Sequence, residues 1–174
     1  ALQEGEKLTA LKEEPEDLRD IIASDIDFIV SSLDGIVFKL ESYINYCIEE
    51  SFGSLPIAIK MRSLSDLLEL VKTDSNSVHI AMGTIDGVSP LIAGLFSLQA
   101  YKGSPICVVH GVFGTKESLM LDLEWPIIEC ISEYCTKIGA TQILLEGPFF
   151  SSLLCDSALE YGFSQSGTIF HKNL

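Results

Sequence analysis

The last third of the chain alternates between short runs of β-branched and apolar residues and longer segments with helical spacing. The runs at 106–109 and 141–147 predict two buried strands, and each is followed by a helical pattern. Two strands joined through a helix lie parallel in one sheet, because a tight turn can only connect antiparallel strands. Residues 104–174 therefore predict the order strand, loop, long helix, strand, helix, strand.

The stretch 109–118 is the predicted loop between the first of these strands and the long helix. Ligands bind at the carboxyl ends of parallel strands, where neighbouring strands diverge, so this loop is the first candidate for a functional site. Pro126 interrupts the helical pattern from 116 to 137. The pattern predicts either a kink at this proline or a new helix that begins with Trp125.

The residues before this unit predict helices followed by a hairpin. Apolar positions from 26 to 48 recur at helical spacing, and Gly35 divides them into two predicted helices. A short strand over 18–23 is predicted before them, with Ser24 as the N-cap of the first helix. Ser63 is predicted to cap a third, short helix over 64–71. The β-rich runs 78–85 and 90–101 flank Asp86–Gly87, which predicts a hairpin.

The chain is predicted to form one α/β domain with a mixed sheet over residues 18–174. Its 174 residues are enough for a single substantial core. Residues 1–17 are mostly charged or small, and they predict an exposed acidic arm that either stays solvated or orders on a partner.

Charge and cysteine content exclude several classes of partner. The net charge of −14 repels nucleic-acid phosphates and anionic lipids, so we expect binding to neither nucleic acid nor a membrane. No apolar run reaches the roughly 18 residues of a membrane span. The five cysteines include no C-x-x-C pair, which predicts reduced thiols in a cytoplasmic protein with no metal site.

Several stretches resemble the GNAT superfamily of acyl-CoA-dependent N-acyltransferases. They are LRDIIASDIDFIV, HIAMGTIDGVSPLIAGLFSLQ, YCTKIGATQILLEG and ALEYGF, with the terminal FHKNL. The resemblance implies a three-layer fold with N-terminal helices, a β-hairpin and a C-terminal βαβαβ unit. More narrowly, the strand end Leu145-Glu146-Gly147 is similar to short GNAT-like proteins of tailed phages, some of which are carried in virions.

The resemblance implies that acetyl-CoA would be held by a loop of the form Q/R-x-x-G-x-G/A before the long helix. Small residues there let backbone amides approach the pyrophosphate. The corresponding residues are Gly111, Val112, Phe113, Gly114, Thr115, Lys116, Glu117 and Ser118. If Gly114 takes the first glycine position, Gly111 replaces Gln or Arg, and Lys116 replaces a small residue. The alternative is a glycine-containing turn in which Thr115 caps the helix.

The resemblance also implies catalytic positions, which this chain fills poorly. The tyrosine that protonates the leaving thiolate would lie four residues before Gly162, where the chain has Ala158, and the available Tyr161 is adjacent to Gly162. A general base would be a carboxylate or histidine near the strand ends. The candidates are His110, Glu146 and Glu117, and a structural role is the alternative for each.

Two functional hypotheses follow. The first is a GNAT-fold protein with a degenerate acyl-CoA loop, acting as an accessory or structural module, for which the phage resemblance suggests a virion. The second is an active acetyl-CoA-dependent N-acetyltransferase that acts on an amine. In the first case we expect a protein partner or a homo-oligomer. Phe149 and Phe150 are expected to pack in the core or, in the second case, to contact pantetheine.

Overall fold

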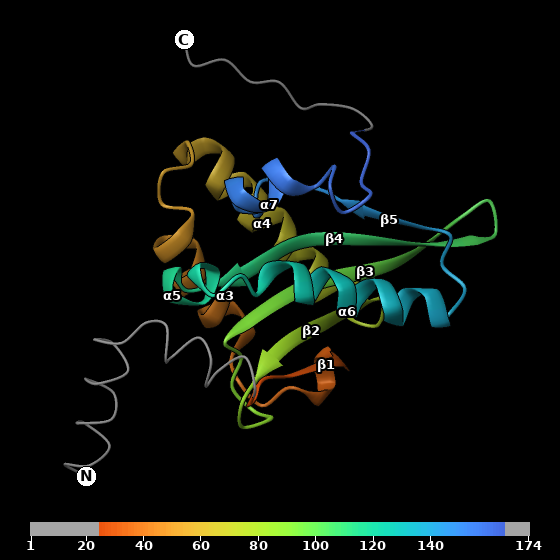
Figure 1. The fold of residues 1–174 in the computed structure, drawn as a ribbon, viewed down its shortest axis with the longest axis horizontal. Helices are drawn as coiled ribbons and strands as arrows, with labels where there is room; N and C mark the ends of the chain where they lie inside the picture. The colour runs from red at the N-terminus through yellow and green to blue at the C-terminus, as the bar shows by residue number, and fades with distance from the viewer. Residues whose placement is uncertain (1–24, 166–174) are drawn as a thin grey trace.

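The computed structural model describes residues 25–165, and Figure 1 labels its elements. In chain order these are β1 (Asp27–Ser32), the 3₁₀ turn η1 (Leu33–Gly35), α3 (Leu40–Ser51), α4 (Ile57–Thr73), β2 (Val78–Thr84), β3 (Ile92–Tyr101), β4 (Ser104–Gly114), α5 (Lys116–Met120), α6 (Glu124–Lys137), β5 (Gln142–Leu145) and α7 (Ser152–Ser157).

One mixed sheet organises the described residues. Its strands run in the order β1-β2-β3-β4-β5, and the first four pair antiparallel. β5 joins β4 in parallel, with Ile106 opposite Gln142 and Val109 opposite Leu145. The predicted hairpin, the predicted parallel pair and the α/β class with a mixed sheet are confirmed.

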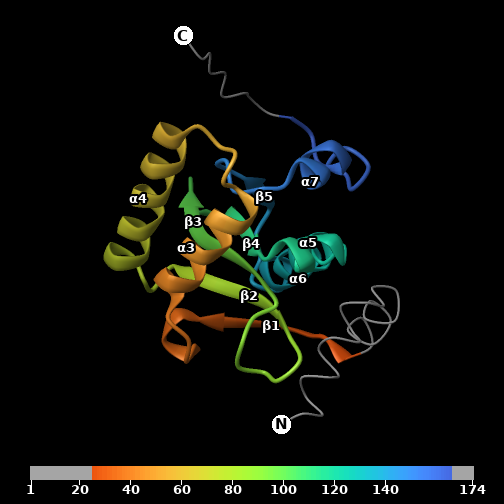
Figure 2. The same cartoon turned by 90° about the vertical axis from the view of Figure 1, so that its left-hand side faces the viewer.

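Helices cover both faces of this sheet, as Figure 2 shows. On one face α3 and α4 bury a cluster that includes Ile44, Leu67 and Phe113. On the other face α6 and α7 bury a second cluster that includes Ile127, Ile131 and Leu154. The molecule thus has three layers, with apolar side chains alternating between the two faces of each inner strand.

A β-bulge interrupts the pairing of β3 with β4. Leu95 lies opposite Gly111 and Phe96 lies opposite Val109, so His110 has no partner on β3. An extra residue shifts the alternation of side chains. Val109 and Val112 therefore both face the α6 side of the sheet, although they are three positions apart.

Two predictions in the first half were wrong. Residues 27–32 form strand β1 instead of a helix, because Phe28, Ile29 and Val30 pair with β2, which would otherwise be the edge strand of the sheet. Spacing alone could not separate the two, because a short apolar run fits either structure. The predicted helix after Gly35 is confirmed as α3. The third helix is longer than predicted, because it begins at Ile57 after Pro56 and places Ser63 in its interior.

The predicted loop over 109–118 was also wrong, because β4 continues to Gly114 and only Thr115 separates it from α5. The glycines suggested a loop, but the apolar residues between them are buried in the sheet. The long helical pattern divides at 121–123, where Asp122 has a φ of 56°. Pro126 then lies in the first turn of α6, close to the predicted alternative of a new helix at Trp125. The last helix is confirmed as α7, which ends at Ser157.

Some predictions lie outside the described residues. They are the arm over 1–17, the strand over 18–23, the cap at Ser24 and the part of the last strand beyond residue 165. Within 25–165, no helix combines the length and the apolar character needed to cross a bilayer. The same residues contain no group of three or more His, Cys, Asp or Glu side chains that could hold a metal ion.

Candidate functional site

The residues predicted to hold a cofactor lie at the carboxyl end of β4, where α3 engages their backbone. The Tyr43 hydroxyl donates to the carbonyl of Phe113 at 2.9 Å, and the Ser51 hydroxyl donates to the carbonyl of Gly114 at 2.7 Å. Both carbonyls belong to residues that are buried in the sheet. This part of the chain is therefore fixed to its neighbours as a strand.

The gap where β5 diverges from β4 is closed by the chain itself. The last direct contact of the parallel pair is the amide of Glu146 with the carbonyl of Val109, at 3.0 Å. Gly147, at a φ of 101°, then turns the chain. The carbonyl of Phe149 accepts a hydrogen bond from the amide of Val112 at 2.9 Å, which closes the gap.

The side chain of Phe149 fills this closed space. Only 2% of the residue is exposed. Its ring centroid lies 5.5 Å from that of Phe113 and 5.6 Å from that of Phe52, in tilted and edge arrangements typical of buried aromatic groups. Of the two roles expected for Phe149, packing in the core is confirmed.

Gly111 is needed for this packing. A Cβ atom at position 111 would lie 2.8 Å from Cζ of Phe113 and 2.8 Å from Cβ of Phe149. At Gly114, the nearest atoms would be at 3.4 Å, which is ordinary van der Waals contact. The atoms that lie close to Gly111 thus belong to the protein's own side chains, those of Phe113 and Phe149.

The rest of the predicted loop forms the start of α5. The Thr115 hydroxyl accepts a hydrogen bond from the amide of Ser118 at 3.2 Å, so the alternative prediction that Thr115 caps a helix is confirmed. Lys116 and Glu117 are exposed in the first turn. α5 has only five residues, and the longer helix that leads to β5 is α6.

The first residue of α6 is a buried carboxyl group that no sequence pattern singled out. Glu124 is 5% exposed, and its Oε1 accepts a hydrogen bond from the Ser151 hydroxyl at 2.6 Å. Its Oε2 is buried and has no hydrogen-bond partner. Burial raises the pKa of Glu124, hydrogen bonds from Ser151 oppose this, and the charge of Asp122 adds to it.

His110 and Glu146, two predicted catalytic candidates, are brought together on the face covered by α3 and α4. Their strands are neighbours, and Glu146 follows the residue opposite Val109. The Nε2 atom of His110 lies 2.7 Å from the Ser97 hydroxyl, and Gln99 donates to that hydroxyl at 3.3 Å. Ser97 can satisfy all three groups by donating its proton to Nε2, which leaves the proton of His110 on Nδ1.

This arrangement holds His110 neutral. Burial lowers the pKa of His110, and the nearby Glu146 carboxylate partly opposes the shift. Ser97 was not predicted, although it is a lone hydroxyl between Phe96 and Leu98 in an apolar run. It is only 1% exposed, so its hydroxyl serves His110 and does not face solvent.

Tyr161, the tyrosine available as a catalytic acid beside Gly162, lies on the other side of the sheet. Its ring stacks on Trp125 of α6 with centroids 3.9 Å apart and planes within 9°. The Trp125 indole N–H also donates to the Ser157 hydroxyl at 2.8 Å. The structure therefore does not place Tyr161 with His110 and Glu146, and Tyr161 instead helps to attach the residues after α7 to α6.

Replacing Glu124 with Gln is expected to stabilise the protein at alkaline pH. The raised pKa means that the folded protein holds this proton to higher pH than the unfolded chain does, whose pKa is near 4.5. The contribution of the protonated group is complete below that value and is lost as pH rises through the folded pKa. Glu124→Gln should exceed the wild type in free energy of unfolding by about 1 kcal/mol at pH 8, with a smaller gain at pH 5.

Urea denaturation at the two pH values measures this difference. Glu133→Gln is the matched control, because Glu133 is an exposed residue of the same helix. A gain from Glu124→Gln that is the same at both pH values would contradict the assignment.

The solved structures that resemble this chain share one fold. No protein-family model matches the sequence, and no curated protein matches it in sequence. Among solved structures, a Trypanosoma brucei acetyltransferase matches with a TM-score of 0.54 at 13% identity, covering 86% of this chain and 100% of that one. A Pyrococcus furiosus protein with a provisional acetyl transferase assignment matches with a TM-score of 0.61 at 12% identity, covering 85% and 100%.

A third match has a cofactor group in its structure. The aminoglycoside acetyltransferase AAC(6')-Iy, solved with the bisubstrate analogue CoA-S-monomethyl-acetylneamine, matches with a TM-score of 0.52 at 14% identity, covering 86% of this chain and 98% of that one. Identities this low establish a shared fold and leave function open. This chain has the fold of the GNAT acetyltransferases.

Proposed function

We propose that this protein is a GNAT-fold module with a degenerate acyl-CoA site, and that it acts as an accessory or structural component through contacts with protein. The observation that carries the proposal is the position of Phe149. Its side chain and backbone fill the divergence of β4 and β5, where a ligand of this fold would enter. The pantetheine arm of acetyl-CoA would have to displace a residue that is 2% exposed.

The acidic residues at the start of α6 support the same proposal. A helix N-terminus binds phosphate through its backbone amides and its positive dipole end. Here Glu124 supplies a carboxyl group at that position, and Asp122 precedes it. Pro126 also removes one amide from the first turn. The residues present therefore do not fit a pyrophosphate, and Lys116 is on the separate, five-residue helix α5.

The proposal includes a virion as one setting for such a module. This part rests on the sequence resemblance to phage proteins around Leu145-Glu146-Gly147.

Acetyl-CoA is expected not to bind. Isothermal titration of the full chain with acetyl-CoA, up to about 1 mM, should give no binding heat. This result would exclude a standard free energy of binding more favourable than about −4 kcal/mol. Micromolar binding that is lost in Lys116→Glu but kept in Lys137→Glu would contradict the proposal. Both lysines are exposed, so neither substitution disturbs the core.

An active N-acetyltransferase is the second candidate, and the pair of His110 and Glu146 favours it. A neutral histidine within β4, at the bulge and beside a carboxylate, is a suitable general base. Ser97 weakens this reading, because its hydroxyl occupies the Nε2 lone pair that would accept the proton. Release of free thiol from acetyl-CoA in the presence of a panel of amines, abolished by His110→Gln, would establish this second function in place of the first.

A further inference from the structure

The short helix α7 is attached to the first turn of α6. Ser151, the N-cap of α7, donates a hydrogen bond to Oε1 of Glu124 at 2.6 Å. At the other end of α7, Ser157 accepts a hydrogen bond from the Trp125 indole at 2.8 Å. Between them Leu154 is buried in the cluster on the α6 side of the sheet. The first two residues of α6 thus supply a hydrogen bond to each end of α7.

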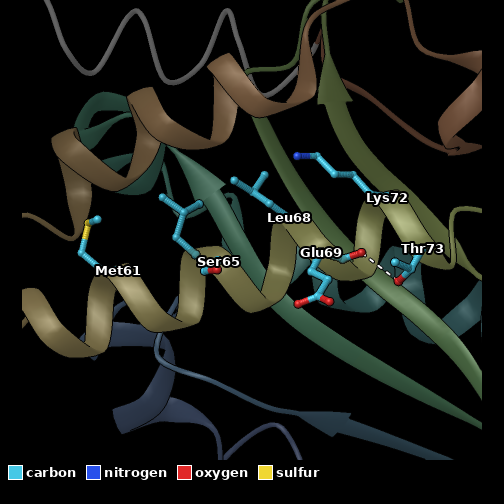
Figure 3. A pocket seen from close by; sticks show the side chains of 7 residues that line it. Met61, Ser65, Leu68, Glu69, Lys72 and Thr73 are labelled. Atoms are coloured by element: carbon cyan, nitrogen blue, oxygen red, sulfur yellow. Dashed lines mark hydrogen bonds between the residues drawn. The ribbon is translucent and has the colours of Figure 1, made fainter.

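One of these two residues is a carboxyl group in an unusual setting. Glu124 is 5% exposed, and its Oε2 has no hydrogen-bond partner within residues 25–165. Over the same range, no basic side chain forms an ion pair with it. By contrast, Glu69 of α4 is exposed beside the surface groove that Figure 3 shows, as is usual for a glutamate. A buried, unpaired carboxylate is far more costly than the neutral acid, so the packed arrangement favours the protonated form of Glu124.

The titratable groups that face Glu124 do not stabilise its charge. Asp122, in the turn before α6, adds a second negative charge, which acts in the same direction as burial. Cys155 faces it from α7, and burial, together with the charge of Glu124, raises the pKa of this thiol above its ordinary value of 9.0. The thiol therefore stays neutral at pH 8, where Glu124 rather than Cys155 changes charge.

When Glu124 ionises, the charge needs water, and α7 is the element that can move to admit it. α6 is held on the sheet by the buried side chains of Ile127, Ile128 and Ile131. α7 has six residues, and Leu154 is the buried one. Elements with few buried contacts open at a lower free energy than the whole fold. Local opening of α7 is therefore the least costly way to hydrate the carboxylate.

We propose that Glu124 makes the attachment of α7 a pH-dependent switch. α7 stays packed on the start of α6 while Glu124 carries its proton, and it separates when the proton passes to solvent. Separation uncovers the apolar surface around Leu154 and Trp125, so this surface is covered at acidic pH and accessible at alkaline pH. The inference goes beyond the proposed accessory role. Its test uses no cofactor, so either proposal can fail while the other stands.

Hydrogen exchange of the full chain, followed by mass spectrometry from about pH 5 to about pH 8, tests the switch. The readout is the protection of peptides covering α7, corrected for the intrinsic exchange rate at each pH. The packed state holds the proton of Glu124 more tightly than the open state, so packing is most stable below the ordinary value of 4.5. Protection should fall by up to about tenfold per pH unit above that value, and level off once pH passes the pKa of packed Glu124.

Two variants identify the group responsible. Glu124→Gln cannot ionise, so its α7 peptides should keep the same protection across the range and exceed the wild type at pH 8. Asp156→Asn is the matched control, because Asp156 is an exposed carboxylate of α7 itself. It should keep the pH dependence of the wild type. Circular dichroism checks that each variant is folded.

Peptides of α4 in the same samples separate local opening from global unfolding. They should remain more protected than those of α7 at every pH, because α4 lies on the other face of the sheet. Equal protection of α4 and α7 would overturn the proposal, because α7 would then open only when the whole protein unfolds. Protection of α7 that does not change with pH, or a pH dependence that persists in Glu124→Gln, would also overturn it.

Discussion

Phe149→Ala is expected to lower the free energy of unfolding by about 3–5 kcal/mol, the usual cost of truncating a buried phenylalanine. Phe149 is 2% exposed and contacts Phe52 and Phe113, so the substitution leaves a cavity between α3 and the ends of β4 and β5. Urea denaturation, followed by the fluorescence of the single tryptophan, Trp125, measures the change.

Phe150→Ala is the matched control, because the neighbouring ring is half-buried and packs on the α6 side of the sheet. It should cost less than Phe149→Ala. A loss below about 1 kcal/mol for Phe149→Ala would contradict the assignment of this residue to the core. The same variant also bears on the degenerate site. We expect it to remain unable to bind acetyl-CoA, because Asp122 and Glu124 still occupy the start of α6.

Gly111→Ala is expected to cost about 1–3 kcal/mol, the usual range for overpacking a core. The added Cβ would lie 2.8 Å from atoms of Phe113 and Phe149, so ring and backbone must both shift. Gly114→Ala is a close control on the same strand, since its Cβ would meet no atom nearer than 3.4 Å. It should change stability by less than about 0.5 kcal/mol, because the unfolded chain also loses freedom when glycine is replaced.

Chemical denaturation of both variants gives the comparison. An equal loss in the free energy of unfolding at the two positions would contradict this prediction, because the packing of Phe149 over Gly111 would then not distinguish the two glycines. A clearly larger cost at Gly111 would support a glycine kept for the protein's own aromatic packing, as opposed to one kept for a cofactor.

Strongly periodic segments were predictable, and segments decided by partners far along the chain were not. Runs of β-branched and apolar residues identified β2, β3 and β5, and helical spacing identified α3 and α6. The same kind of pattern was misread over 27–32, because only the edge of β2 decides that this short run is a strand. Gly111 and Gly114 suggested a loop. Their place in a strand could not be predicted, because it is decided by pairing with residues of β3 that are distant in sequence.

The candidate site divides in the same way. His110 and Glu146 could be proposed from the sequence because each ends an apolar run that predicts a strand, and parallel pairing then brings them together. Ser97 and Glu124 could not be proposed, because a buried polar group is recognised only by its partner, and those partners are 13 and 27 residues away. Tyr161 was proposed because it is the tyrosine available beside Gly162, but the stack on Trp125 places it on the opposite face of the sheet.

By itself the sequence determined the alternation of strands and helices in the last third and the acidic charge, because both depend on local pattern and composition. Tertiary structure alone decided that β4 extends through the predicted loop, that Phe149 closes the gap between β4 and β5, and that a carboxyl group begins α6. The physical reason is that each of these features is set by contacts between segments far apart in the chain. Local propensity cannot specify such contacts, and side-chain packing can.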